Sequence, residues 1–174
     1  TTCEMIWDGA IGDVREVHAW TNASRWNKKL LAGKPAEEPV PKGMNWDLWL
    51  GPREARPFSS AYSPVSWRDF WDFGTAPIGD FFCHNFDPAL WALNLREPLS
   101  IEASAAGGVD SYIAPVGGLY TYQFGARDKM PPVKFIWYEG GLMPPRPEGL
   151  EPDDQLGANG NGILFVGDKG LITC

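Results

Sequence analysis

Hydrophobic and polar residues alternate from Val14 to Asn22, where β-branched and aromatic side chains are interleaved with polar ones. This pattern predicts a β-strand. Residues 4 to 8 before it have the pattern of a last helical turn, which Gly9 and Gly12 would close. Because Thr1 stands where an initiator methionine would, we expect the chain to continue a longer polypeptide, with residues 1–12 as the end of a preceding helix and a domain junction.

The next part of the chain has little periodicity. Residues 28–43 are rich in Lys, Pro, Glu and Gly, which predicts a surface loop. A short helix is expected over residues 45–50, with Asn45 as its N-cap and a stop at Gly51. Residues 53–75 are irregular and aromatic, which predicts a loop that covers another part of the molecule.

Residues 77–95 follow a helical pattern that contains Pro88. Proline can open a helix at its first position but kinks a helix that must continue through it. We therefore expect two helical pieces, over residues 78–86 and 88–94.

Strand patterns fill the remainder of the chain and are separated by Gly and Pro clusters. A turn at residues 168–170 leads to a last short strand. These elements predict an α+β fold, with an open, mostly antiparallel β-sheet and helices on one face. The expected strands are residues 99–106, 120–126, 133–138 and 163–166.

Composition narrows the function classes. The 174 residues carry a net charge of −7 without a basic stripe, which argues against a nucleic-acid partner. No apolar run approaches the ~20 residues of a membrane span, so no membrane partner is expected, and the first residues do not form a signal peptide. The three cysteines are far apart and predict neither a disulfide framework nor a metal site, with Cys83 expected to be a buried apolar residue.

The strongest chemical pattern is Asp80 followed four residues later by His84. On one helix these side chains would share a face, and a histidine near its neutral-pH pKa can take the hydroxyl proton of an alcohol while a carboxylate orients it. Alternatively, Asp80 caps a helix and His84 is a core histidine. A metal site formed by Asp80, His84 and Asp87 is disfavoured, because the only other histidine, His18, lies on a distant strand.

Four more residues are candidates for sugar stacking and hydroxyl recognition: Trp20, Tyr62, Trp67 and Arg68. Their alternative role is core and loop packing. A dinucleotide-binding GxGxxG turn does not occur in the sequence. A cofactor of that kind would therefore need residues outside this chain.

Several motifs occur in an order and spacing that resemble the Gfo/Idh/MocA oxidoreductases, especially a bacterial, planctomycete-like branch. The similarity covers essentially the whole chain. The motifs are WDGAIGDVREVHAW (7–20), NWDLWLGP (45–52), WRDFWDFGTAPIGDFFCHNFD (67–87), MPPVKFIWYEGG (130–141) and FVGDKG (165–170).

The resemblance implies that residues 13–174 are the C-terminal substrate and oligomerisation domain of a protein whose own N-terminal Rossmann domain binds NAD or NADP. It implies an open sheet that packs on that domain and builds homo-oligomers, and we expect its free face to be apolar. Asp80 and His84 correspond to the Asp-x-x-x-His pair of the family, which takes part in proton transfer together with a Rossmann-domain lysine. In the related sequences a small residue replaces Phe82 and a glycine replaces Pro77, so both positions could crowd the pocket. Expected substrate contacts are Trp20, Tyr62, Trp67, Arg68 and Asp87.

The resemblance therefore implies oxidation of a sugar or cyclitol hydroxyl by a nicotinamide cofactor. Two alternatives stay open: a glycoside hydrolase of the same superfamily that uses NAD transiently, and a non-catalytic sheet domain for assembly. The compartment, the sugar and the choice between NAD and NADP are not specified by these residues.

Overall fold

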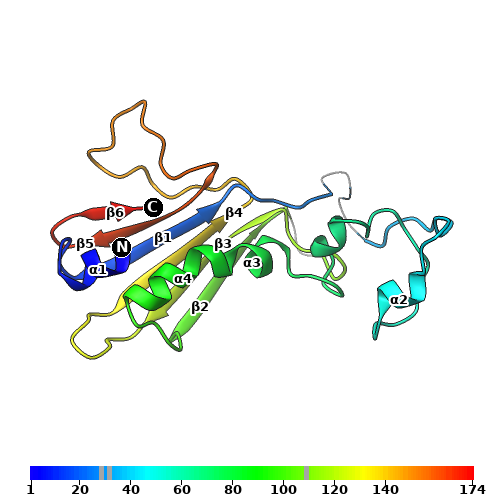
Figure 1. Cartoon of the computed structure of the whole chain (residues 1–174), viewed down its shortest axis with the longest axis horizontal. Helices are drawn as coiled ribbons and strands as arrows, with labels where there is room; N and C mark the ends of the chain where they lie inside the picture. Colours follow the sequence, from blue (N-terminus) through cyan, green and yellow to red (C-terminus); the bar gives the residue numbers. More distant parts are fainter. Residues whose placement is uncertain (28–29, 31–32, 108–109) are drawn as a thin grey trace.

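Six strands form one open sheet in the order β2-β3-β4-β1-β5-β6 (Figure 1). The computed structural model describes residues 1–27, 30, 33–107 and 110–174. Most of the expected loop over residues 28–43 is described, but positions 28, 29, 31 and 32 lie outside the described residues. The strands are β1 (Val14–Thr21), β2 (Ser100–Ala106), β3 (Gly117–Phe124), β4 (Val133–Glu139), β5 (Asn161–Gly167) and β6 (Leu171–Thr173).

The sheet is mostly antiparallel, as the sequence predicts. Only the central pair β1 and β4 runs parallel, with Val17 opposite Phe135 and Ala19 opposite Trp137. The other four pairs of neighbouring strands are antiparallel. The two central strands carry the most buried side chains, because neighbours cover them on both edges and on both faces.

Three helices cover one face of the sheet: α1 (Thr2–Trp7), α3 (Ala76–Asp80) and α4 (Phe82–Ala92) (Figure 1). The main core lies between α4 and the sheet. Phe82 and Phe86 stack on each other and meet the ring of Phe135 edge-on. Asn85 Nδ2 donates a 2.6 Å hydrogen bond to the carbonyl of Trp20, which ties α4 to the end of β1.

The break between α3 and α4 falls at Phe81, so the predicted break at Pro88 is wrong. Pro88 lies inside α4, where the helix stays continuous because Phe82, Phe86 and Ala89 all face the sheet. Phe82 therefore fills the core and does not crowd the outer surface. Asp80 and His84 consequently belong to two successive helices and not to one helical face.

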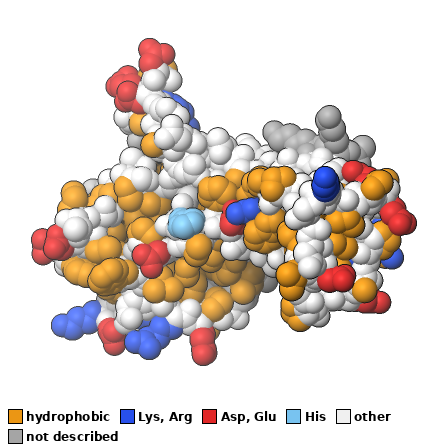
Figure 2. Space-filling view, turned by 45° about the vertical axis from the view of Figure 1, so that its right-hand side comes forward, with side chains coloured by type: hydrophobic (Ala, Val, Ile, Leu, Met, Phe, Trp, Pro, Cys, Tyr) orange, Lys and Arg blue, Asp and Glu red, His pale blue; other side chains and the backbone are white. Residues whose placement is uncertain are grey.

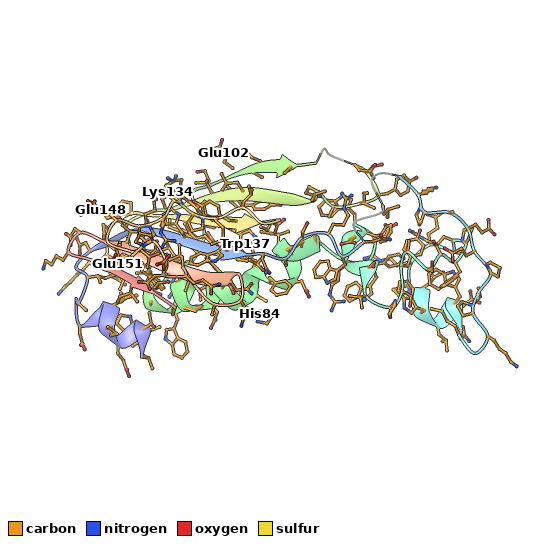
Figure 3. The ribbon with its side chains drawn as sticks, turned by 90° about the horizontal axis from the view of Figure 1, so that it is seen from above. His84, Glu102, Lys134, Trp137, Glu148 and Glu151 are labelled. Carbon is orange, nitrogen blue, oxygen red and sulfur yellow. The ribbon has the colours of Figure 1, made fainter. Side chains whose placement is uncertain are left out.

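The opposite face of the sheet is mainly polar or covered, which corrects the expectation of an open apolar face. Over β1 and β5 it is covered by the segment 140–160, whose Leu150 and Leu156 pack on Trp20 and Leu164. Towards β2 the face carries exposed or half-buried polar side chains, among them Glu102 and Lys134 in Figure 3. Large exposed apolar side chains instead gather on the outer surface of α1 and α4: Met5, Trp7, Leu90 and Trp91.

Residues 22–75 form an aromatic lobe beyond the end of β1. The described residues of this lobe contain only two helices, α2 (Trp46–Leu50) and the 3₁₀ helix η1 (Ser66–Asp69). Asn45 caps α2 as predicted, since its side chain accepts a hydrogen bond from the Leu48 N–H. A separate aromatic cluster holds the lobe together: Trp46, Trp49, Phe58, Tyr62, Phe70 and Phe73.

Two further features bear on function. Cys83 is exposed on α4, so the prediction of a buried cysteine is wrong: it lies on the side of the helix away from the sheet. In the described parts of the chain, no helix combines the length and apolar character that a membrane crossing requires.

Candidate functional site

The site is built where the aromatic lobe meets the helical layer. Arg68, on η1, donates a 3.2 Å hydrogen bond from Nε to Oδ2 of Asp80, the last residue of α3. Both side chains are about one-third exposed, at 28% and 37%. An ion pair of substrate-accessible groups therefore joins the lobe to the helices.

Two glycines allow this close approach. A Cβ on Gly74 would lie 2.6 Å from the Cα of Arg68, and a Cβ on Gly79 would lie 1.6 Å from the Thr75 hydroxyl oxygen. Neither separation is sterically allowed. The turn after η1 and the first turn of α3 can therefore fold against their neighbours only because glycine has no side chain.

Aromatic rings surround the Arg68 guanidinium. Its Cζ lies 4.5 Å from the ring centroid of Trp67 and 5.5 Å from that of Trp26. Trp26 in turn stacks on Phe81 at a centroid separation of 6.4 Å. Cation–π contact and the ion pair together hold the planar guanidinium in a fixed orientation.

His84 follows on the first turn of α4, and its ring lies edge-on to Phe81 with centroids 6.4 Å apart. The side chain is exposed, and within the described chain its ring forms no hydrogen bond or ion pair, including to Asp80. Figure 2 shows an exposed histidine side chain that is surrounded mainly by hydrophobic side chains. Both ring nitrogens are therefore available to a ligand.

A shallow cavity of about 290 Å³ adjoins His84 and passes between α4 and the end of β5. Asn85, Pro88 and Gly162 line it with His84. Asn85 is fixed by its bond to the Trp20 carbonyl, so one wall of the cavity is rigid.

Two buried charged residues behind this site, Asp69 and Arg25, were not predicted from the sequence. Asp69 has no exposed surface, and its carboxylate accepts hydrogen bonds from the backbone N–H groups of Trp26 at 2.9 Å and Asn27 at 2.7 Å. Burial raises its pKa. Arg25, 3% exposed, donates to the carbonyls of Ala114 and Leu30. Nothing in the spacing identifies this arrangement, because the partners are backbone groups and most of them are distant in the sequence.

Two of the other predicted contacts, Trp20 and Tyr62, are buried away from His84. Trp20 is fully buried on the far face of the sheet, under Leu156. Tyr62 is 6% exposed and packs between Trp46 and Phe70 in the lobe. Neither ring face is open to a sugar here, whereas Asp87 is exposed on α4.

The arrangement can perform proton transfer. An exposed imidazole can accept a proton from a bound hydroxyl, and the Arg68–Asp80 pair offers donors and acceptors for further hydroxyls. The aromatic rings beside them provide apolar surface for the carbon skeleton. No group of three or more His, Cys, Asp or Glu in the described ranges is placed to hold a metal ion.

The chain does not itself fit a dinucleotide. Its glycines do not form a strand-to-helix turn that would cradle a pyrophosphate, and among the described residues the helix behind the main core, α4, begins at Phe82 without a preceding strand.

Comparison with known proteins identifies the family of this domain. Residues 12–126 match the family model described as "Oxidoreductase family, C-terminal alpha/beta domain", of the Gfo/Idh/MocA group. Among solved structures, the chain is similar to an oxidoreductase from Thermotoga maritima, with 14% identity and a TM-score of 0.47 over 98% of this chain. The chain spans 36% of the length of that protein. A search of the curated proteins finds no match.

Proposed function

The chain belongs to the Gfo/Idh/MocA oxidoreductase family as a C-terminal alpha/beta domain, and on this premise we propose that it forms the substrate side of a nicotinamide-dependent dehydrogenase acting on a sugar or cyclitol hydroxyl. The observation that carries the proposal is the unpartnered, exposed imidazole of His84 beside the Arg68–Asp80 ion pair. NAD or NADP would supply the hydride acceptor from a Rossmann domain.

The geometry supports a role for each of these residues. His84 accepts the proton of the reacting hydroxyl, and its ring is aligned by the edge-on contact with Phe81. Asp80 is a positioning residue, because its carboxylate is bound to Arg68 rather than to His84. Arg68 and Trp67 form the wall against which the substrate lies.

The apolar surface of α1 and α4 supports a docked Rossmann domain on the helical side. Met5, Trp7, Leu90 and Trp91 are between 42% and 67% exposed. A concentration of large apolar side chains on one surface is typical of a domain interface. Because this surface and His84 both belong to the helical layer, a domain bound there would bring its cofactor to the side of the molecule that carries the reacting hydroxyl.

The homo-oligomer through the sheet stays a prediction. Strand β2 lies at the edge of the sheet and is exposed along its whole length, which leaves one row of its backbone groups available for pairing. Sedimentation of the natural protein at increasing concentration tests it. A monomer at every concentration would contradict it.

The activity test uses the natural polypeptide that carries this chain. It would be incubated with NAD⁺ or NADP⁺ and a panel of sugars and cyclitols, and reduced nicotinamide would be measured by absorbance. His84→Ala should lower kcat by about 10²–10⁴-fold. The matched control is Glu97→Gln, which changes an exposed charge away from the site.

Two outcomes would overturn the proposal. One is unchanged turnover in His84→Ala. The other is release of nitrophenol from nitrophenyl glycosides without net reduction of cofactor, which would assign the protein to the glycoside hydrolases of the superfamily.

A further inference from the structure

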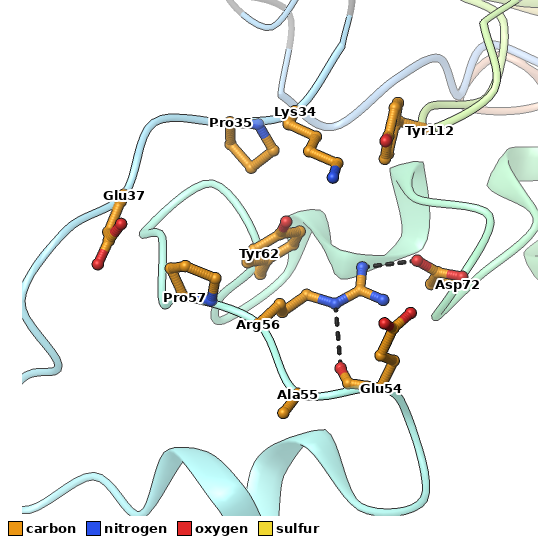
Figure 4. Close-up of a pocket in the computed structure, with 10 residues that line it drawn as sticks. All are labelled: Lys34, Pro35, Glu37, Glu54, Ala55, Arg56, Pro57, Tyr62, Asp72 and Tyr112. Carbon is orange, nitrogen blue, oxygen red and sulfur yellow. Dashed lines mark hydrogen bonds and ion pairs between the residues drawn. The ribbon is translucent and has the colours of Figure 1, made fainter.

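The aromatic lobe contains a second cavity, of about 430 Å³, which no part of the proposed reaction uses. Its volume lies in the range of small-molecule sites, about 300–1,000 Å³. Ten residues line it, from several segments of the chain: Lys34, Pro35, Glu37, Glu54, Ala55, Arg56, Pro57, Tyr62, Asp72 and Tyr112 (Figure 4).

Both positively and negatively charged side chains line this cavity. Figure 4 shows the ends of Lys34 and Arg56 directed into the same space. The Arg56 guanidinium is held on the far side by Asp72, 2.6 Å away, and lies 5.1 Å from the ring centroid of Phe73. Lys34 Nζ lies 5.1 Å from the ring centroid of Tyr112. The two cationic groups are thus placed by their neighbours before any ligand binds.

The charges of the lining favour an uncharged ligand. Two cations, Lys34 and Arg56, are accompanied by three carboxylates, Glu37, Glu54 and Asp72. A phosphate or carboxylate ligand would meet these acidic groups, and one of the cations is already paired. A ligand with many hydroxyl groups can instead accept from Lys34 and Arg56 and donate to Glu37 and Glu54.

A short path of contacts joins this cavity to the candidate active site. Asp72 lines it, and the next residue, Phe73, lines a neighbouring cavity of about 260 Å³ with Trp49 and Trp67. Trp67 stacks on Arg68, which binds Asp80. Aromatic rings and charged groups that can bind hydroxyls thus occur between this cavity and Asp80: Phe73, Trp67 and Arg68.

We propose that this cavity binds the distal residue of a neutral oligosaccharide whose reacting end lies at His84. The inference rests on the proposed function for the position of the reacting end, but the cavity and its ligand class are independent of turnover. The substrate is accordingly longer than a single sugar. Trp49, Trp67 and Phe73 contact its middle, and Lys34 and Glu54 bind the hydroxyls of its far end.

Calorimetry on the natural protein tests the proposal without catalysis. Glucose would be compared with cellobiose, maltose, cellotriose and maltotriose, with inorganic phosphate and glucuronic acid as charged probes. At least one neutral trisaccharide should bind more tightly than glucose. Lys34→Met and Glu54→Gln should each weaken that binding about tenfold or more, the loss expected when a hydrogen bond to a charged group is removed.

Matched controls are Lys42→Met and Glu97→Gln, which remove exposed charges elsewhere and should leave the affinity unchanged. Equal affinity for glucose and the longer sugars overturns the inference, as does tight binding of phosphate that Lys34→Met abolishes. His84→Ala should leave trisaccharide affinity nearly intact while it lowers turnover. A failed dehydrogenase assay with intact Lys34-dependent trisaccharide binding would reject the proposed function and leave this cavity assigned.

Discussion

The sheet with its helices and the aromatic lobe are stabilised in different ways. In the first region, β1 and β4 place Val17, Phe135 and Trp137 under α4, and backbone hydrogen bonds fix the register. In the described part of the lobe, regular structure is limited to α2 and η1, and side-chain contacts hold the loops in place. A cluster of aromatic rings and the buried Asp69 hold loops that have few ladder hydrogen bonds.

This difference explains where the candidate site lies. The sheet offers a rigid base, and the lobe offers loops that present polar groups and ring faces. Arg68 belongs to the lobe and Asp80 to the helices, so their ion pair lies at the boundary of the two regions. Chemistry at this boundary combines rigid support with adaptable contacts.

The largest predicted effect concerns the sheet core. Phe135→Ala removes a fully buried ring that meets Phe82, Phe86 and Tyr122. The free energy of unfolding should fall by about 3–5 kcal/mol, measured by urea denaturation. The control Leu48→Ala truncates a side chain that is 79% exposed and should cost less than about 0.5 kcal/mol. Similar costs for the two variants would contradict the assigned core.

A smaller, local effect is expected in the lobe. Asp69→Asn keeps the shape but can accept only with one oxygen, so either the Trp26 or the Asn27 N–H faces an amide group. The cost should be about 1–3 kcal/mol. Hydrogen exchange should accelerate at these two amides while β1 and β4 stay protected. Uniform acceleration across the sheet would show that the lobe and the sheet are one cooperative unit.

The free energy of unfolding should depend on pH through another buried group, Glu139. Glu139 is fully buried at the end of β4 and accepts from Trp137 Nε1 at 2.9 Å and the Tyr120 hydroxyl at 3.1 Å. Burial raises its pKa above the ordinary value of 4.5, so the folded protein holds this proton more tightly than the unfolded chain.

Stability from Glu139 is therefore greatest below pH 4.5 and is lost as the pH rises through the raised pKa. Glu139→Gln should remove this decline, measured as the difference between the variant's and the parent's unfolding free energies across the pH range. A difference that does not change with pH would show that Glu139 does not titrate there. Glu97→Gln, which removes an exposed carboxylate elsewhere and should keep the decline, serves as the control.

The smallest expected effect on stability concerns the ion pair between the lobe and the helices. Arg68→Met breaks the ion pair with Asp80 but keeps an apolar stem beside Trp26 and Trp67. Because both charges are partly exposed, the free energy of unfolding should change by only about 0–1 kcal/mol. Thermal denaturation checks this. A much larger loss would make the pair a structural joint, whereas a small loss with weakened sugar binding would sharpen its role in the site.

Most of the regular structure could be predicted from the sequence. Alternation identified β1, β4 and β5, and Asn45 and Gly51 marked the ends of α2. These signals are local, because strand alternation and capping depend on neighbouring residues. The prediction failed at Pro88, where a local rule competes with packing: three side chains of α4 must face the sheet together.

The candidate site was only partly predictable. From residue type, His84 could be named as able to transfer a proton, and Arg68 and Trp67 as able to contact a sugar. Their arrangement could not, because Trp26 lies 42 positions before Arg68, and Asp69 accepts hydrogen bonds from backbone groups 42 and 43 positions away. Neither residue carries a motif. Trp20 and Tyr62 show the same limit, since their burial depends on contacts with distant segments.

By itself, then, the sequence determined the α+β order of elements, the open sheet and the family, because periodicity, caps and motif order are written in short stretches of residues. Tertiary structure alone decided that Asp80 pairs with Arg68, that His84 has no hydrogen-bonding partner among the described residues, and that the apolar surface lies on the helices. The physical reason is that burial and charge pairing depend on three-dimensional neighbours: side chains that are distant in the sequence pack together and exclude water.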